Sequence, residues 1–133
     1  MHVLFEKAHR LSREVIGAAI EVHQIMGPGL LESIYQKCLI RELELRGIPA
    51  IKQQTVQVEY KQLVFTEELR FDVLVDGCLL VELKAVQEMH PIFKAQLLSY
   101  MKLLHLPLGL LINFHEIRLV DGISRMILHG ADK

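Results

Sequence analysis

The first fifty residues place hydrophobic and polar side chains with the period of an α-helix. Seven apolar residues recur every three or four positions, namely Leu4, Ala8, Leu11, Val15, Ala18, Val22 and Ile25. This spacing predicts an amphipathic helix that ends at Gly27-Pro28-Gly29. A second helical pattern runs from about Leu30 to Arg46 and ends at Gly47-Ile48-Pro49. We therefore expect an αα-hairpin.

The middle of the chain changes to the two-residue period of β-strands. Apolar and polar residues alternate from Val56 to Tyr60, and Leu63-Val64-Phe65 is a candidate short return strand. The segments Arg70–Val75 and Leu79–Lys84 flank Asp76-Gly77-Cys78, which indicates a second β-hairpin.

The last third combines one helix with further strands. Pro91 suits the first turn of a helix, which should run to about His105 and bury four side chains: Phe93, Leu97, Met101 and Leu104. Further strands are expected at Leu108–Asn113, Ile117–Val120 and, after a turn at Gly122, Arg125–Leu128. The order predicts a mixed α/β fold with helices on a largely antiparallel sheet. With no visible repeat or linker, residues 1–133 are expected to form a single domain.

The register of the hairpin within residues 70–84 decides which side chains share a face. A two-residue turn at Asp76-Gly77 would mix charged and apolar residues on both faces. A three-residue loop instead makes one face wholly apolar, with the pairs Phe71/Leu83, Val73/Val81 and Val75/Leu79. The other face then carries the pairs Arg70/Lys84, Asp72/Glu82 and Leu74/Leu80. The hydrophobic pattern favours this second register.

In this register Asp72 and Glu82 are direct neighbours across the two strands, with Cβ atoms roughly 4.5–5.5 Å apart. Such like charges are unfavourable unless a cation lies between them or one carboxyl is protonated. Lys84 projects from the same face. Two carboxylates with an ammonium group form a hard-oxygen site suited to Mg²⁺ or Mn²⁺. The alternative is a solvated strand face that carries a ladder of charges.

Composition limits the partners of the protein. Fifteen Lys and Arg residues against sixteen Asp and Glu residues give a net charge of −1, so no overall field favours nucleic acid or membranes. Cys38 and Cys78 are too few for a disulfide scaffold and have no zinc-site spacing. The stretch from Leu97 to Phe114 is interrupted by charge and proline, and no signal-peptide pattern precedes it. We expect a cytoplasmic protein without membrane spans.

Short motifs along the chain resemble a known group of nucleases. Asp72, followed after nine residues by Glu82-Leu83-Lys84, resembles the D…(D/E)xK signature of PD-(D/E)XK nucleases, although Phe71 replaces the usual proline. The segment from Gln96 to Tyr100 is similar to the QxxxY motif of the RecB-like branch. The segment from Gly29 to Tyr35 resembles the motif of the GxxExxY family. The resemblance extends over nearly the whole chain.

The resemblance implies a restriction-endonuclease-like core and a metal-dependent phosphodiesterase or nuclease. Asp72, Glu82 and the backbone carbonyl of Leu83 would bind Mg²⁺ or Mn²⁺, which would lower the pKa of a bound water. Lys84 would orient that water or stabilise developing charge. A role for Lys84 as a simple base is less favoured, because neighbouring carboxylates favour its charged form.

Four further residues are candidates for the same site. Glu32 would complete the metal or water network, although a glutamate in a first helical turn also stabilises the helix dipole. Gln96 and Tyr100 would hold substrate or the lysine, or else pack the helix on the sheet. His23 is a possible accessory residue, with an ordinary core histidine as the alternative.

The substrate and the partners are less determined. Basic groups at Lys7/Arg10/Arg13 and Lys37/Arg41 favour only modest, metal-assisted binding of nucleic acid. One alternative is a catalytically silent module on the same fold that binds nucleic acid or a protein partner. Another is a small-molecule hydrolase that uses the same metal site. The many apolar residues also permit a homodimer.

Overall fold

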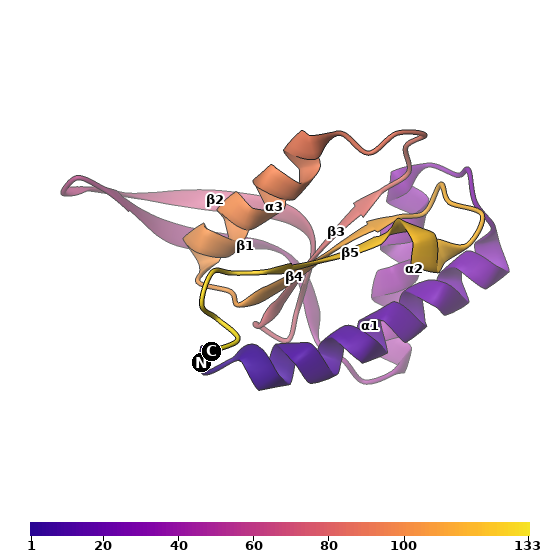
Figure 1. The fold of residues 1–133 in the computed structure, drawn as a ribbon, viewed down its shortest axis with the longest axis horizontal. Helices are drawn as coiled ribbons and strands as arrows, with labels where there is room; N and C mark the ends of the chain where they lie inside the picture. The colour runs from indigo at the N-terminus through magenta and orange to yellow at the C-terminus, as the bar shows by residue number, and fades with distance from the viewer.

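The structure is a computed structural model and describes residues 1–133. Its elements, in chain order, are α1 (Phe5–Met26), α2 (Glu32–Leu45), β1 (Ala50–Tyr60), β2 (Leu63–Val75), β3 (Leu79–Lys84), α3 (Pro91–Leu104), β4 (Leu108–Asn113), the short 3₁₀ helix η1 (Leu119–Gly122) and β5 (Ile123–Ile127) (Figure 1). The two chain ends lie side by side, where the His2 N–H donates to the Ala131 carbonyl at 2.9 Å.

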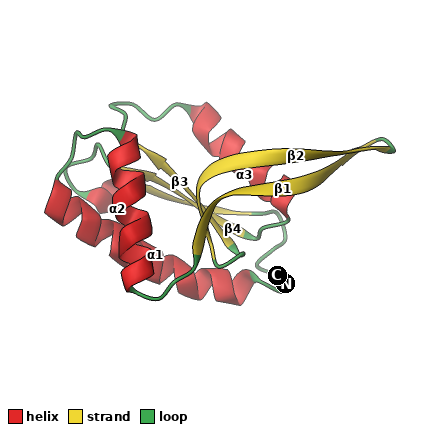
Figure 2. Cartoon of the chain, turned by 180° about the vertical axis from the view of Figure 1, so that it is seen from behind, coloured by secondary structure: helices red, strands yellow, loops and turns green.

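The five strands form one sheet in the order β1-β2-β3-β4-β5. Only β3 and β4 run parallel, and α3 forms the connection between them. The other neighbouring pairs are antiparallel. The helices α1 and α2 cover one face of the sheet and α3 covers the other (Figures 1 and 2). The predicted αα-hairpin and the mixed, largely antiparallel α/β fold are therefore confirmed.

Each face of the sheet has its own hydrophobic core. The larger core, of 19 buried residues, joins α1 and α2 to side chains from the central strands such as Val73, Val81 and Leu83. The smaller core, of 7 buried residues, lies under α3 around Leu97 and Met101. Burial of the apolar stripes explains why these amphipathic segments form helices here. None of the helices is both long enough and apolar enough to cross a membrane.

The predicted register of the hairpin between β2 and β3 is confirmed at its closed end. The pairs are Val73/Val81, Leu74/Leu80 and Val75/Leu79. The loop turns at Asp76 and Gly77, whose φ angles are 46° and 68°. Glycine adopts this left-handed region without a steric penalty, which suits the tight three-residue connection.

The expected pairing of Phe71 with Leu83 on one apolar face is wrong. Phe71 packs in the smaller core under α3, whereas Leu83 packs in the larger core on the opposite face. The cause is an irregularity in the pairing of β2 with β1. Ile51 pairs with Leu74, and the next pair is Gln53 with Arg70. Between these two pairs β1 advances by two residues and β2 by four. Extra residues in one strand change which face the following side chains occupy.

Two other expectations about strands need correction. The short strands at 56–60 and 63–65 are parts of β1 and β2, a long hairpin that extends away from the helices (Figure 2). Ile117–Val120 is not a strand: Ile117 is 87% exposed, and the chain turns through η1 before β5. At that turn a Cβ on Gly122 would lie only 2.5 Å from the Asn113 carbonyl oxygen, so the close approach requires glycine.

Candidate active site

A cavity of about 310 Å³ opens where β2 and β3 pass between α2 and α3. The side chains around it are Glu32, Gln36, Arg70, Phe71, Asp72, Glu82, Lys84, Gln96 and Tyr100. Every side chain predicted for the catalytic and metal-binding groups is therefore in this one place, with the exception of the accessory candidate His23.

Four elements deliver these groups. Glu32 is the first residue of α2, which begins after the glycine-rich turn, and Gln36 lies one helical turn later. Asp72 and Glu82 come from neighbouring strands, and Glu82 is two residues from the end of β3. Gln96 and Tyr100 are four residues apart on α3, so both point from the same side of that helix.

Asp72 and Glu82 are joined through hydrogen bonds to the backbone. The Asp72 N–H donates to Glu82 Oε1 at 3.3 Å, and the Leu83 N–H donates to Asp72 Oδ2 at 2.8 Å. The regular pairing of β2 with β3 ends one residue earlier, at Val73 and Val81. The two carboxylates thus replace backbone partners where the strands separate, which holds them beside each other.

The electrostatics of the cavity are those of crowded carboxyl groups. Burial, followed by the charge of Asp72, raises the pKa of Glu82 to about 7. Burial also raises the pKa of Asp72, although its hydrogen bond from Leu83 opposes the change. The pKa of Glu32 is raised by burial and then by Asp72. Lys84 opposes all three shifts, so the one ammonium group only partly compensates the three carboxyls.

Lys84 is held over an aromatic ring. Its Nζ lies 4.3 Å from the centre of the Phe93 ring, at the start of α3. Phe93 is only half-buried, whereas its helical spacing predicts a buried core residue. The negative face of an aromatic ring attracts a cation, so this contact helps to hold the Lys84 ammonium in place.

Comparison with known proteins agrees with this arrangement. A family model described as the PD-(D/E)XK nuclease superfamily matches residues 9–126. The chain belongs to the PD-(D/E)XK nuclease superfamily. Comparisons with curated proteins and with solved structures found no match. The three residues whose spacing resembles the superfamily motif in the sequence, Asp72, Glu82 and Lys84, all line this cavity.

Nucleases of this superfamily typically use divalent metals, and the donors present fit a hard cation. Mg²⁺ usually takes one or two carboxylates and keeps several waters. The Lys84 carbonyl accepts a hydrogen bond from Phe114 beyond β4, and successive carbonyls along a strand alternate in direction. The Leu83 carbonyl is therefore directed to the β2 side, where Asp72 lies.

The same geometry argues against a closed metal site of the zinc type. No group of three or more His, Cys, Asp or Glu side chains is arranged to hold a metal ion. Glu32 lines the same cavity as Asp72 and Glu82.

His23 does not join this cavity. It is buried on α1, where its Nε2 donates to the Glu116 carbonyl at 2.7 Å and its ring lies 6.3 Å from that of Phe114. These contacts are those of a core histidine with a satisfied polar group, which was the alternative interpretation of the sequence.

Three residues of the site were missed from the sequence. Gln36 donates through Nε2 to the Asp72 carbonyl at 3.1 Å, and Arg70 lines the cavity. Phe93 holds Lys84. Two of them have a detectable signal. Gln36 is four residues after Glu32, so both lie on one face of α2. Arg70 shares the predicted hairpin face of Asp72 and Glu82.

Proposed function

We propose that this chain is a metal-dependent nuclease that hydrolyses phosphodiester bonds in nucleic acid. The observation that carries the proposal is the pair Asp72 and Glu82, held together by backbone hydrogen bonds beside Lys84. A half-buried pair with raised pKa values is strained without a cation, and a bound divalent ion removes that strain.

Asp72, Glu82 and the Leu83 carbonyl are the groups that would hold Mg²⁺ or Mn²⁺. When bound, the ion supplies a water of lowered pKa and neutralises charge on the phosphate. Lys84, whose ammonium lies over the Phe93 ring, stabilises the negative charge that develops on the phosphate oxygens. This electrostatic role agrees with the geometry better than a role as general base.

Glu32 would orient a water molecule in the cavity that it lines together with Asp72 and Glu82. Gln96 and Tyr100 contact the substrate from α3, where both face the cavity. The affinity for nucleic acid is expected to be modest, because a net charge of −1 provides little excess of cations for phosphates.

The finer assignment to the GxxExxY family and the RecB-like branch also belongs to this proposal. The tyrosine of the first motif, Tyr35, is fully buried, and its hydroxyl donates to the Gly27 carbonyl at 2.6 Å and accepts from the Leu30 N–H at 3.0 Å. These bonds fix the turn before Glu32. The motif is thereby explained as a device that positions Glu32.

The proposal is tested by measuring Mn²⁺-dependent cleavage of DNA and RNA. We expect the wild type to cleave, and Asp72→Asn and Lys84→Met to lose on the order of 10²–10³-fold in rate. Asp121→Asn and Lys133→Met, which change exposed residues away from the cavity, serve as matched controls and should retain the rate. Cleavage that survives both site substitutions belongs to a contaminant and contradicts the proposal.

The competing function is a silent binding module on the same fold. Nucleic-acid binding by folded wild-type protein, with no cleavage in Mg²⁺ or Mn²⁺, would support that module and overturn the nuclease. The cytoplasmic location and the homodimer stay predictions.

A further inference from the structure

A second cavity, of about 540 Å³, lies along the outer side of α3 and adjoins the candidate active site. It shares Gln96 and Tyr100 with the cavity of the acidic pair. The remaining lining includes Ile92, Phe93, Ser99 and Leu103. We call this lining the α3 platform. Its volume is within the range of about 300–1,000 Å³ that is typical of ligand sites.

The α3 platform carries no charged side chain. Ile92 is 56% exposed and Leu103 is 37% exposed, although both are large apolar residues. A surface that binds phosphates requires cations, whereas an uncharged wall with an aromatic ring and a few amide or hydroxyl groups suits a planar base. Two cations, Arg70 and Lys84, line the adjoining active-site cavity instead.

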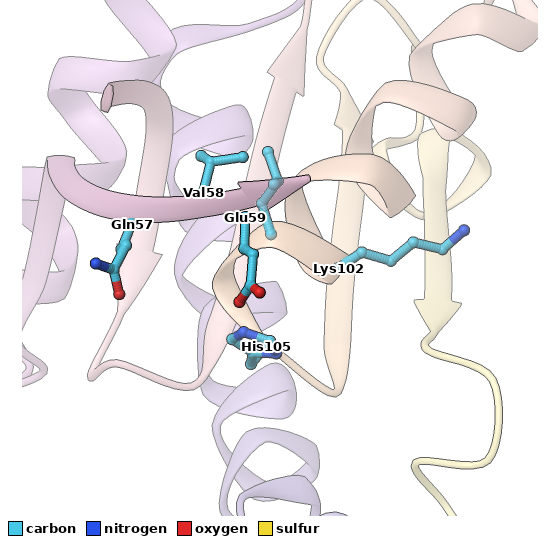
Figure 3. A pocket seen from close by; sticks show the side chains of 6 residues that line it. Gln57, Val58, Glu59, Lys102 and His105 are labelled. Atoms are coloured by element: carbon cyan, nitrogen blue, oxygen red, sulfur yellow. The ribbon is translucent and has the colours of Figure 1, made fainter. Parts of the chain in front are cut away.

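The far end of the platform adjoins a cavity lined by groups of both charges. A third cavity shares Leu103 with the platform and is also lined by Glu59, Lys102 and His105. In Figure 3 the Glu59 carboxylate points toward His105, while the Lys102 ammonium points away from both. From Ile92 to Leu103 the helix rises about 16 Å at 1.5 Å per residue, which limits the platform to a short segment.

We propose that the α3 platform holds unpaired bases next to the phosphate that is cleaved, so that the substrate is a single strand. The inference rests on the proposed nuclease function and specifies its substrate class. Bases in a duplex are stacked and paired, so they are not available to an apolar wall. Unpaired bases stack on aromatic and apolar side chains in a manner that tolerates any sequence.

The test uses fluorescence anisotropy with the full chain and two six-residue deoxyoligonucleotides, one normal and one abasic. Both carry the same phosphates, and EDTA excludes cleavage during the measurement. We expect the normal strand to bind at least about 5-fold more tightly, the lower limit for stacking of one base. The 56% exposed Ile92 permits Ile92→Ala without loss of the fold, and this variant should reduce the preference, as should Tyr100→Ala.

Ile25→Ala is the matched control, because Ile25 is also an exposed helical isoleucine, 72% exposed, but lies on α1 outside the platform. Equal binding of the normal and abasic strands, or equal effects of Ile92→Ala and Ile25→Ala, would overturn the platform. A blunt duplex that binds as tightly as the single strand would also overturn it.

Cleavage in Mn²⁺, measured on the same strands, separates this inference from the proposed function. Cleavage without any preference for bases contradicts the platform and leaves the nuclease standing. A preference for bases that depends on Ile92, without cleavage, supports the platform as a base-binding surface and contradicts the nuclease.

Discussion

The N–H of Asp72 donates to the Glu82 carboxylate, while the Asp72 carboxylate accepts from the N–H of Leu83, the residue that follows Glu82. These two hydrogen bonds extend the β2–β3 hairpin beyond its last regular pair, Val73 and Val81, with carboxylates in place of backbone carbonyls. Hydrogen bonds to charged groups stabilise by about 1.5–3 kcal/mol each, so the two bonds offset part of the cost of placing two carboxylates together. They fix the positions of the carboxylates before any cation is bound.

We predict that the metal-free protein loses stability as pH rises from about 4.5 to about 7. The pKa of Glu82 is raised to about 7 in the folded protein, so the folded state binds its proton more tightly than the unfolded state. The raised pKa values of Asp72 and Glu32 act in the same direction. The Glu82 contribution is at most about 3 kcal/mol. Urea unfolding in EDTA at pH 5 and pH 8 measures the difference.

Glu82→Gln provides the control for this pH dependence. It removes the titrating group and keeps the shape of the side chain, so the free energy of unfolding should vary less between pH 5 and pH 8. At pH 8 the variant should be more stable than the wild type. An unchanged dependence on pH in the variant would show that Glu82 is not responsible.

Phe93→Leu is expected to lower kcat, measured at saturating substrate, by about 2- to 30-fold. The contact between its ring and Lys84 is worth about 0.5–2 kcal/mol, and its loss leaves the ammonium less well positioned. Phe93→Tyr, which keeps the ring, should retain the rate. Phe65→Leu changes a phenylalanine on the exposed hairpin and is the matched control. Equal rates for Phe93→Leu and Phe65→Leu would contradict this role.

Gln36→Ala is expected to lower the rate about 3- to 10-fold at limiting Mn²⁺. Its side chain donates to the Asp72 carbonyl, and a lost hydrogen bond of this kind costs about 0.5–1.5 kcal/mol. The rate should recover at saturating Mn²⁺, since Gln36 positions a metal ligand and does not itself contact the ion. Gln24→Ala, on the exposed side of α1, should behave as wild type. A deficit that persists at saturating metal would argue for a different role.

His23→Ala should destabilise the fold by about 1–3 kcal/mol without a change in the cleavage rate of the folded protein. The substitution removes a buried hydrogen bond to the Glu116 carbonyl and packing against Phe114. Thermal unfolding and single-turnover cleavage measure the two effects. If the folded His23→Ala variant instead lost much of its cleavage rate, His23 would have a role in catalysis, contrary to this prediction.

The sequence predicts those elements of the fold in which apolar residues recur at the regular spacing of a helix or a strand. The apolar alternation of β2 and β3 correctly predicts that Val73 faces Val81, and this pairing follows from burial alone. The sequence predicts only short pieces of the long β1–β2 hairpin because residues 66–70 are polar and exposed apart from the half-buried Leu69, so no alternation marks them. The face of Phe71 depends on an irregularity of the backbone, which a pattern of residue types does not encode.

The candidate site follows the same division. Motif residues such as Asp72 and Gln96, distant in sequence, do meet in one cavity. Contacts that support these motif residues cannot be predicted from the sequence, because they depend on how the helices and strands are arranged in space. Phe93 reaches Lys84 only because the crossover after β3 returns α3 over the strand end.

The central claim is that Asp72 and Glu82 together bind a divalent cation, and calorimetric titration with Mn²⁺ tests it most directly. We predict one Mn²⁺ site in the wild type, with binding lost in Asp72→Asn and Glu82→Gln and retained in Asp121→Asn. Circular dichroism confirms that each variant is folded. A folded wild type that binds no Mn²⁺ at millimolar concentration, or one whose binding survives both substitutions, would contradict the account.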